Sequence, residues 1–229
     1  MSRTRSTNTG SSNPSAKFIE WKSSKKAWTY YDKELEKEVE IPFDGLAFIV
    51  LDELNTVKGY DKATKKGMWS NEVRNVTKEE FCVRWKDGVV IEGLWNDIKG
   101  KDRRLSFTKS VYVMAKGGDG YELVNLQLRG GAMGKWFDFT KENDVNGNLV
   151  ISATSLIEDG ENTFPGFAVV SKTLSAEASA QADKMDEKLQ VYLDSYFGSE
   201  QAAPQTPSTD TPAPDKEEEE AALDEEPPF

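Results

Sequence analysis

The chain has 229 residues, a formal net charge of −11, no histidine and a single cysteine, Cys82. A zinc site needs about four cysteine or histidine ligands, and Ser–His or Cys–His catalysis needs an imidazole, so the composition excludes both kinds of site. One cysteine also excludes an internal disulfide framework, which favours a reducing compartment, and we expect a cytoplasmic protein that is not an enzyme and holds no metal or other cofactor.

Residues 1–16 are mostly Ser, Thr, Asn and Arg and offer almost nothing to bury, so we expect a disordered N-terminal arm. The arm contains no apolar stretch of the kind found in a signal peptide. The longest apolar run of the chain, at residues 46–51, is far shorter than the roughly 20 residues that span a bilayer. The sequence therefore predicts a soluble, intracellular protein.

Residues 17–173 carry short runs of β-type composition separated by Gly and Asp. Three of the separators, Asp87-Gly88, residues 117–120 and Asn146-Gly147, supply the residues with φ > 0 that tight hairpins require. Many short strands joined by hairpin turns indicate an antiparallel barrel or sandwich. The expected strands are residues 28–31, 39–43, 46–58, 81–86, 89–92, 105–116, 121–129, 149–156 and 167–172.

Residues 174–198 change to a helical period. Leu174, Ala178, Ala182 and Leu189 lie on one helical stripe, and Gly198 follows as a natural stop. We expect one amphipathic helix that covers the barrel, with a role in dimerisation as the alternative.

Residues 199–229 begin with a linker rich in Pro, Thr and Ala and end in an acidic block, for which we expect disorder. This tail contains ten acidic residues and one lysine, a charge of −9, so the remaining 198 residues carry only −2. A folded part so close to neutral can present a basic groove to nucleic acid, whereas the tail repels phosphate.

The tail ends in an aromatic residue instead of trailing off in polar ones. Acidic runs commonly do no more than solvate a disordered end, but here a hydrophobic ring and a free α-carboxylate follow the acids. The ring can fill an apolar pocket while the carboxylates meet Lys or Arg around the rim, so we expect a hook for partner proteins. The residues of this hook are Asp224, Glu225, Glu226, Pro227, Pro228 and Phe229.

In this feature the sequence resembles the bacterial and phage single-stranded DNA-binding proteins, whose tails are acidic and end in Pro-Phe or Asp-Phe. The resemblance implies that the tail recruits replication or recombination proteins and competes with DNA for the groove of its own protein. The sequence departs from the cellular pattern in having Pro227-Pro228-Phe229 where an isoleucine often precedes the proline.

Two segments of the folded part, residues 58–74 and 99–112, interleave basic and aromatic residues. Single-strand binders need this mixture, because cations follow the phosphates while each base stacked on a ring contributes roughly 1–3 kcal/mol. The candidate DNA-binding residues are Lys58, Tyr60, Lys62, Lys65, Lys66, Trp69, Arg74, Lys101, Arg103, Arg104, Lys109 and Tyr112.

Tryptophan and tyrosine also build cores, and for Tyr60 and Trp69 the sequence leaves both roles open. We expect Trp85, Trp95 and Trp136 in the core. A weaker third candidate surface combines aromatic residues with nearby lysines: Trp21, Trp28, Tyr30, Tyr31, Lys17, Lys22, Lys25 and Lys26.

The stretches 68–74, 108–113 and 130–136 also resemble those of phage-encoded proteins regarded as single-stranded DNA binders, a similarity that spans residues 45–140. It implies an OB-type barrel, whose open face and loops bind oligonucleotides. We therefore expect a mainly β protein: an OB-like antiparallel barrel with long hairpin loops, one C-terminal amphipathic helix and a disordered acidic tail. Residues 130–136 are no P-loop, because only three residues separate Gly130 from Gly134 and Trp136 stands where Ser or Thr is needed.

The sequence thus predicts sequence-independent binding and protection of single-stranded DNA in replication, recombination or repair, in the host cytoplasm if the protein is phage-encoded. The alternatives are an acidic-tailed protein that inhibits a host enzyme by DNA mimicry, a structural virion protein, and RNA binding as a variant. A nuclease built on acidic pairs such as Asp52 and Glu53 is not expected, because such pairs arise by chance among 40 acidic residues. The oligomeric state stays open.

Overall fold

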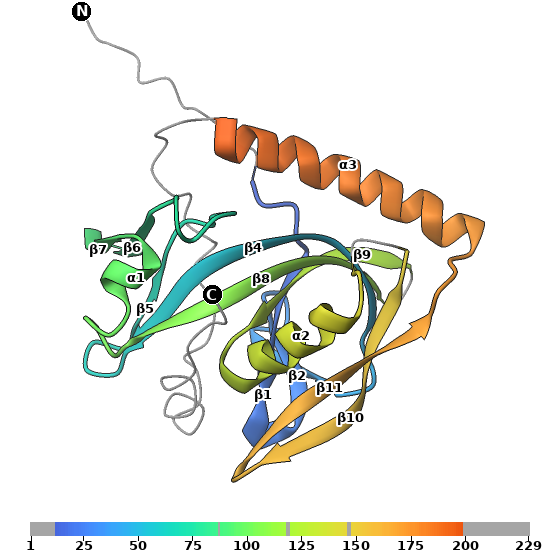
Figure 1. The fold of residues 1–229 in the computed structure, drawn as a ribbon, viewed down its shortest axis with the longest axis horizontal. Helices are drawn as coiled ribbons and strands as arrows, with labels where there is room; N and C mark the ends of the chain where they lie inside the picture. The colour runs from blue at the N-terminus through green and yellow to red at the C-terminus, as the bar shows by residue number, and fades with distance from the viewer. Residues whose placement is uncertain (1–11, 87, 118–119, 146–147, 199–229) are drawn as a thin grey trace, which may run out of the picture.

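The computed structural model describes residues 12–86, 88–117, 120–145 and 148–198. They form eleven strands and three α-helices (Figure 1), so the predicted mainly β fold is confirmed. The strands are β1 (Lys17–Lys22), β2 (Ala27–Asp32), β3 (Lys37–Pro42), β4 (Ala47–Asp61), β5 (Lys66–Trp69), β6 (Phe81–Trp85), β7 (Gly88–Gly93), β8 (Leu105–Lys116), β9 (Tyr121–Leu128), β10 (Val150–Asp159) and β11 (Asn162–Ser171). The helices are α1 (Trp95–Ile98), α2 (Gly130–Glu142) and α3 (Ala176–Gly198), and a 3₁₀ turn, η1, covers Ser23–Lys25.

All eleven strands belong to one sheet, and nine of them follow the order β3-β2-β1-β9-β8-β4-β5-β6-β7. The other two, β10 and β11, pair with each other, and β10 also pairs with part of β4. Neighbouring strands are antiparallel except β1 and β9, which are parallel. β1, which was not among the expected strands, lies between β2 and β9. Within the described residues β3 and β7 do not pair with each other, so the sheet is open and mixed where we expected a closed antiparallel barrel.

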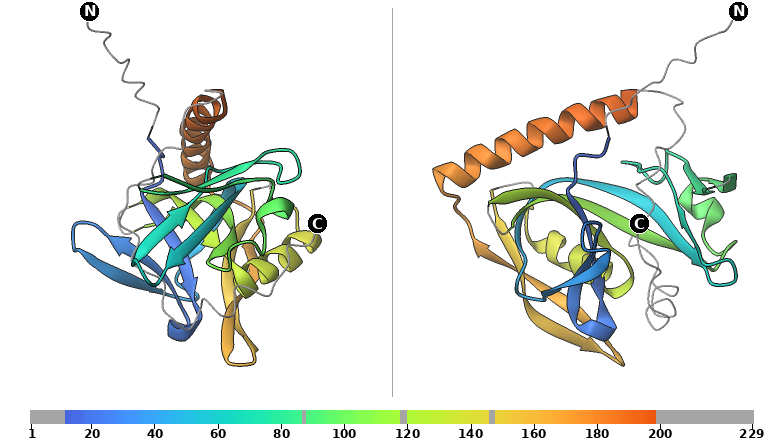
Figure 2. Two further views of the ribbon diagram at one scale, coloured as in Figure 1. Left: turned by 90° about the vertical axis from the view of Figure 1, so that its left-hand side faces the viewer. Right: turned by 180° about the vertical axis from the view of Figure 1, so that it is seen from behind.

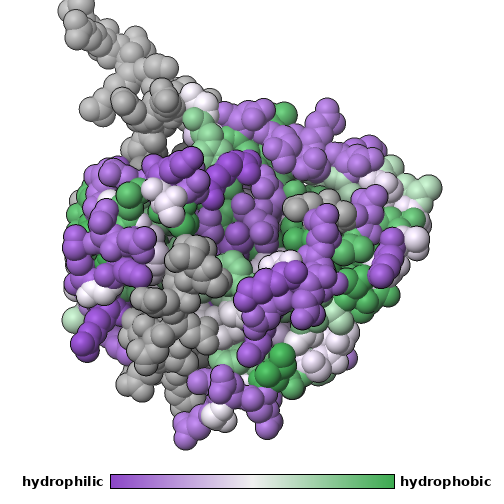
Figure 3. Space-filling view, viewed as in Figure 1, coloured by the Kyte–Doolittle hydropathy of each residue, from purple (hydrophilic) through white to green (hydrophobic). Residues whose placement is uncertain are grey.

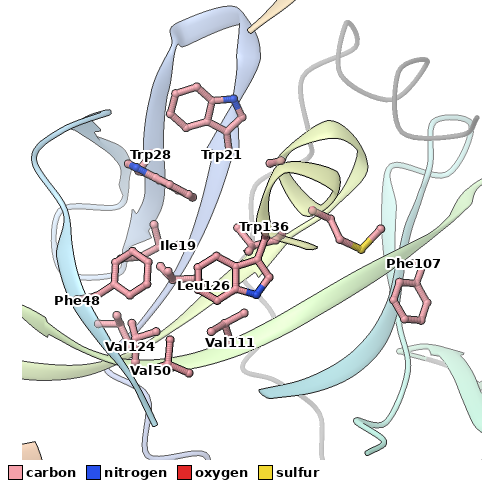
Figure 4. Packing of buried hydrophobic residues seen from close by; sticks show 14 of the residues in the cluster. Ile19, Trp21, Trp28, Phe48, Val50, Phe107, Val111, Val124, Leu126 and Trp136 are labelled. Atoms are coloured by element: carbon pink, nitrogen blue, oxygen red, sulfur yellow. The ribbon is translucent and has the colours of Figure 1, made fainter. Parts of the chain in front are cut away.

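The strands of one half of the sheet curve around α2, as Figures 1 and 2 show. Trp136 of α2 is fully buried and projects between Phe48, Val111 and Leu126 (Figure 4). This helix was not predicted from the sequence, because its three glycines obscure the helical period. A Cβ on Gly131 would lie 2.2 Å from the Phe164 ring, so the close approach of α2 to β11 requires glycine there.

The outer ends of β4 and β8 extend beyond this half and carry β5, β6, β7 and α1, which together we call the distal lobe (Figure 1). The interior of the lobe is built from aromatic rings, with Phe81 6.4 Å from Trp95 and 6.3 Å from Phe107 between ring centroids. These rings belong to the same core cluster as Trp136, so one continuous core supports the distal lobe and the curved half.

The helix expected at residues 174–198 is present as α3. The strands β4, β8 and β9 pack against α2 on one face and against α3 on the opposite face. Its Leu189 and Leu193 contact Leu54, Tyr112 and Leu123. Two alanines of its first half, Ala178 and Ala182, pack in a second cluster with Ile49 and Met114. None of the helices in the described part of the chain combines the length and the apolar character of a membrane span.

Candidate nucleic-acid interface

The two basic segments of the sequence meet at the free end of the distal lobe. The last residues of β4 pair with β5 on one side and with the start of β8 on the other, so that Lys58 lies opposite both Trp69 and Ser106. We call this end, comprising residues 58–69, 84–86 and 99–106, the basic tip. It contains ten Lys or Arg and only two acids: Lys58, Lys62, Lys65, Lys66, Arg84, Lys86, Lys99, Lys101, Arg103 and Arg104, with Asp61 and Asp102. Figure 3 shows hydrophilic side chains, with hydrophobic ones among them, on the side of the molecule where β5 and α1 lie.

The two acids of the basic tip hold Arg104 in place. Its Nη1 donates to Asp61 Oδ2 at 2.8 Å, and its Nε and Nη2 donate to the Asp102 carboxylate at 2.9 and 2.6 Å. Hydrogen bonds from this guanidinium lower the pKa of Asp102. Asp61 also accepts the backbone N–H of Ala63 at 2.9 Å, which fixes the turn between β4 and β5. The turn residues Lys62 and Lys65 are exposed, as are Lys101 and Arg103 on the neighbouring segment.

Trp85, which we expected in the core, is the aromatic residue at the centre of the basic tip. It packs on the core with part of its surface but is only half-buried. Lys66 Nζ lies 5.9 Å and Arg104 Cζ 5.7 Å from its ring centroid, within cation–π range. The expectation fails because β6 ends at Trp85, at the margin of the lobe, where fewer neighbours cover a core-facing ring. Trp95 and Trp136, in contrast, are buried as predicted.

Tyr60 and Trp69, for which the sequence left two roles open, are half-buried and lie on the face opposite to Trp85. Trp69 is paired directly with Lys58 of β4 and Arg84 of β6, and paired residues project from the same face of a sheet. Tyr60 is paired with Gly67, where an added Cβ would meet no atom within 4 Å, so the space above Gly67 is open.

Lys58 is held at the inner side of this face. Its Nζ lies 3.1 Å from Glu20 Oε1, and Arg129 Nη2 lies 3.3 Å from Glu20 Oε2. Burial alone would raise the pKa of Glu20, but the charges of Lys58 and Arg129 outweigh it and lower the pKa to about 2. The pair anchors the basic tip to β1.

Three predicted DNA-binding residues lie away from the basic tip. Arg74 is exposed, forms a two-pronged ion pair with Asp52 at 2.9 and 3.1 Å, and lies over the Phe197 ring of α3. Lys109 is half-buried, 3.4 Å from Glu53 and near the Phe137 ring of α2. Neither position extends the surface formed by residues 58–69.

The third, Tyr112, is fully buried beneath α3, so no base can stack on it in this conformation. Its hydroxyl donates to Glu72 Oε2 at 2.6 Å and accepts from Asn13 Nδ2 at 2.9 Å. Tyr112 was predicted to bind DNA, but α3 covers this side of β8.

Three residues of the weaker third surface, Trp21, Lys22 and Trp28, are buried. Trp21 and Trp28 are buried with ring centroids 5.2 Å apart. Lys22 and Lys25 both pair with Glu38 at 2.6 Å, so their charge is directed at β3.

The hook formed by Asp224, Glu225, Glu226, Pro227, Pro228 and Phe229 lies outside the described residues. No group of three or more Cys, Asp or Glu in the described part of the chain could hold a metal ion. No family model, curated protein or solved structure matches this chain.

Proposed function

We propose that the protein binds single-stranded DNA without sequence preference through the basic tip and protects it during replication, recombination or repair in a phage-infected or bacterial cell. The observation that carries the proposal is the meeting of segments 58–69, 84–86 and 99–106 at one end of the distal lobe, with ten cations and three half-buried rings distributed over its two faces. Cations alone would suit any polyanion, but rings beside them suit unpaired bases, because bases in a duplex are already stacked.

Lack of sequence preference follows from the kinds of groups present. Lysines contact phosphates, which carry no sequence information, and every base has a face that can stack on an indole or phenol ring. We also propose, from the sequence resemblance, that the fold is related to the OB-type barrels. The open sheet of this protein departs from a closed barrel. Recruitment of replication or recombination proteins by the tail is likewise part of it.

A gel-mobility titration of a labelled oligo(dT) with the full-length protein tests the function. Binding at low salt that weakens as salt rises is the expected result, and a double-stranded oligonucleotide of the same length should bind less tightly. A folded protein that leaves the mobility of the single strand unchanged at low salt would contradict the proposal and favour DNA mimicry, because a mimic of DNA charge does not bind DNA.

A further inference from the structure

The basic tip carries the same arrangement on both of its faces. Arg84 and Trp85 are consecutive in β6, so they project from opposite faces of the sheet. On the face of Arg84, Trp69 lies between Lys58 and Arg84. On the face of Trp85, the ring lies within 6 Å of Lys66 Nζ and Arg104 Cζ. Each face therefore presents one half-buried indole beside two cations.

The cations of the two faces are not equivalent. Nε, Nη1 and Nη2 of Arg104 all donate to Asp61 or Asp102, so the guanidinium is fixed beside the Trp85 ring and is poorly placed to take up a phosphate. We expect this face to hold a base by stacking. On the other face, Arg84 donates through Nε to Cys82 Sγ at 3.3 Å, a weak partner that a phosphate oxygen can replace.

The turn between β4 and β5 connects the two faces around the end of the sheet. Every residue from Lys62 to Gly67 is exposed, and three of these six are lysines. A phosphate backbone that leaves one face therefore meets three lysines before it reaches the other.

We infer that one DNA strand passes around the basic tip, with one base stacked on Trp85, the backbone crossing the turn at Lys62 and Lys65, and a later base stacked on Trp69 beside Tyr60. This inference rests on the proposed function and adds the path of the strand. A surface on one face alone would leave one of the two indoles without a role in binding.

The test compares Trp69→Leu and Trp85→Leu with the unchanged protein, using oligo(dT) of about 4 and about 16 nucleotides, the range of site sizes of single-strand binding folds. For the long oligonucleotide each substitution should weaken binding roughly 5- to 150-fold, the effect of losing one stacked base. The complex with the long strand should contain one strand per protein. Phe137→Leu is the matched control, because the half-buried Phe137 also lies under a lysine, with Lys109 Nζ 6.0 Å from its ring centroid, but outside the basic tip.

Since either substitution can also disturb the fold, photo-crosslinking of the unchanged protein provides an independent measurement. Long oligonucleotides containing 5-iododeoxyuridine should crosslink to Trp85 and to Trp69 or Tyr60 in the same one-to-one complex. Crosslinks to one face only, full affinity in one of the two Trp variants, or two long strands per protein would overturn the inference while leaving DNA binding intact. Absence of any DNA binding would instead contradict the proposed function itself.

Discussion

The Arg104 guanidinium donates to the Asp61 carboxylate at 2.8 Å, joining two residues that are 43 positions apart in the sequence. Asp61 begins the turn between β4 and β5, and Arg104 immediately precedes β8. This contact locks together the two basic segments that separately suggested nucleic-acid binding. The tip is consequently a fixed surface, and its geometry can be tested by substitutions that leave its charge unchanged.

Glycine substitutions in β4 and β5 provide such a test. A Cβ on Gly59 would lie 2.4 Å from the backbone oxygen of Arg104, whereas a Cβ on Gly67 would meet nothing within 4 Å. Gly59→Ala should therefore separate β4 from β8 at the basic tip, lower the free energy of unfolding by about 1–3 kcal/mol and weaken DNA binding. Gly67→Ala, in the same hairpin, should leave both quantities nearly unchanged. Urea unfolding and oligo(dT) affinity measured on the two variants check this, and equal behaviour would argue against the pairing of Gly59 with β8.

Adjacent arginines should affect the salt dependence of binding differently. Arg103 is exposed, so Arg103→Gln should reduce the salt slope by roughly 0.7, the value for one phosphate contact on a single strand. Arg104 is engaged by two carboxylates, so Arg104→Gln should weaken binding through loss of the support of Trp85 and the turn, with a smaller change of slope. The slope comes from affinities at several salt concentrations. A larger slope change in Arg104→Gln than in Arg103→Gln would contradict the assigned roles.

The Glu20 ion pairs should make stability depend on acid pH. The folded pKa of Glu20 is about 2, against an ordinary value of 4.5. A depressed pKa stabilises the folded state above the ordinary pKa, by about 3 kcal/mol here, and this contribution disappears as the pH falls from 4.5 toward 2. Glu20→Gln should thus be less stable than the unchanged protein at pH 7, and the difference should shrink below pH 4.5. Denaturant unfolding at pH 7, 5, 4 and 3 measures the difference in free energy of unfolding between the two proteins. A difference that is independent of pH would show that the ion pairs do not cause it.

Removal of the tail should tighten DNA binding. Residues 221–229 carry three acids and the ring of Phe229, and a tethered polyanion competes with DNA for the same cations. Deletion of these residues should therefore lower the dissociation constant for oligo(dT), most strongly at low salt. Phe229→Ala, which keeps every charge, separates electrostatic competition from docking of the ring. Identical affinities with and without residues 221–229 would contradict this competition.

Strand composition and turn residues predicted much of the sheet. Where a strand or a turn was predicted wrongly, a few residues of that segment explain the error. Residues 105–116 were predicted as a strand and form β8, because their β-branched and aromatic residues are bounded by turn residues. The segment Lys66–Trp69 was missed as β5, because a lysine and a glycine make half of it resemble a loop. Asn146-Gly147 was expected to join two strands, but the described elements on either side are α2 and β10.

The basic residues of the candidate site could be predicted from the sequence, but the burial of its aromatic residues could be predicted only in part. The pairing of β4 with β8 brings together two lysine-rich segments that are far apart in the sequence. The register of this pairing cannot be predicted from the sequence of either segment alone. Trp85 alternates with Phe81 and Val83, a pattern that indicates a core position, and only the end of the strand leaves it half-exposed. Tyr112 was expected at the surface and is buried. Its burial depends on the packing of α3, a helix far away in the sequence, so the residues around Tyr112 do not reveal it.

The salt slope of oligo(dT) binding in two triple variants of equal charge decides whether the basic tip is the DNA-binding surface. One replaces Lys62, Lys65 and Lys66 of the basic tip by Gln, and the other replaces the exposed Lys33, Lys172 and Lys184, which lie elsewhere. We predict that the first variant loses roughly 2 from the slope, or about 0.7 per phosphate contact, while the second keeps the slope of the unchanged protein. Equal slopes in the two variants would contradict the account.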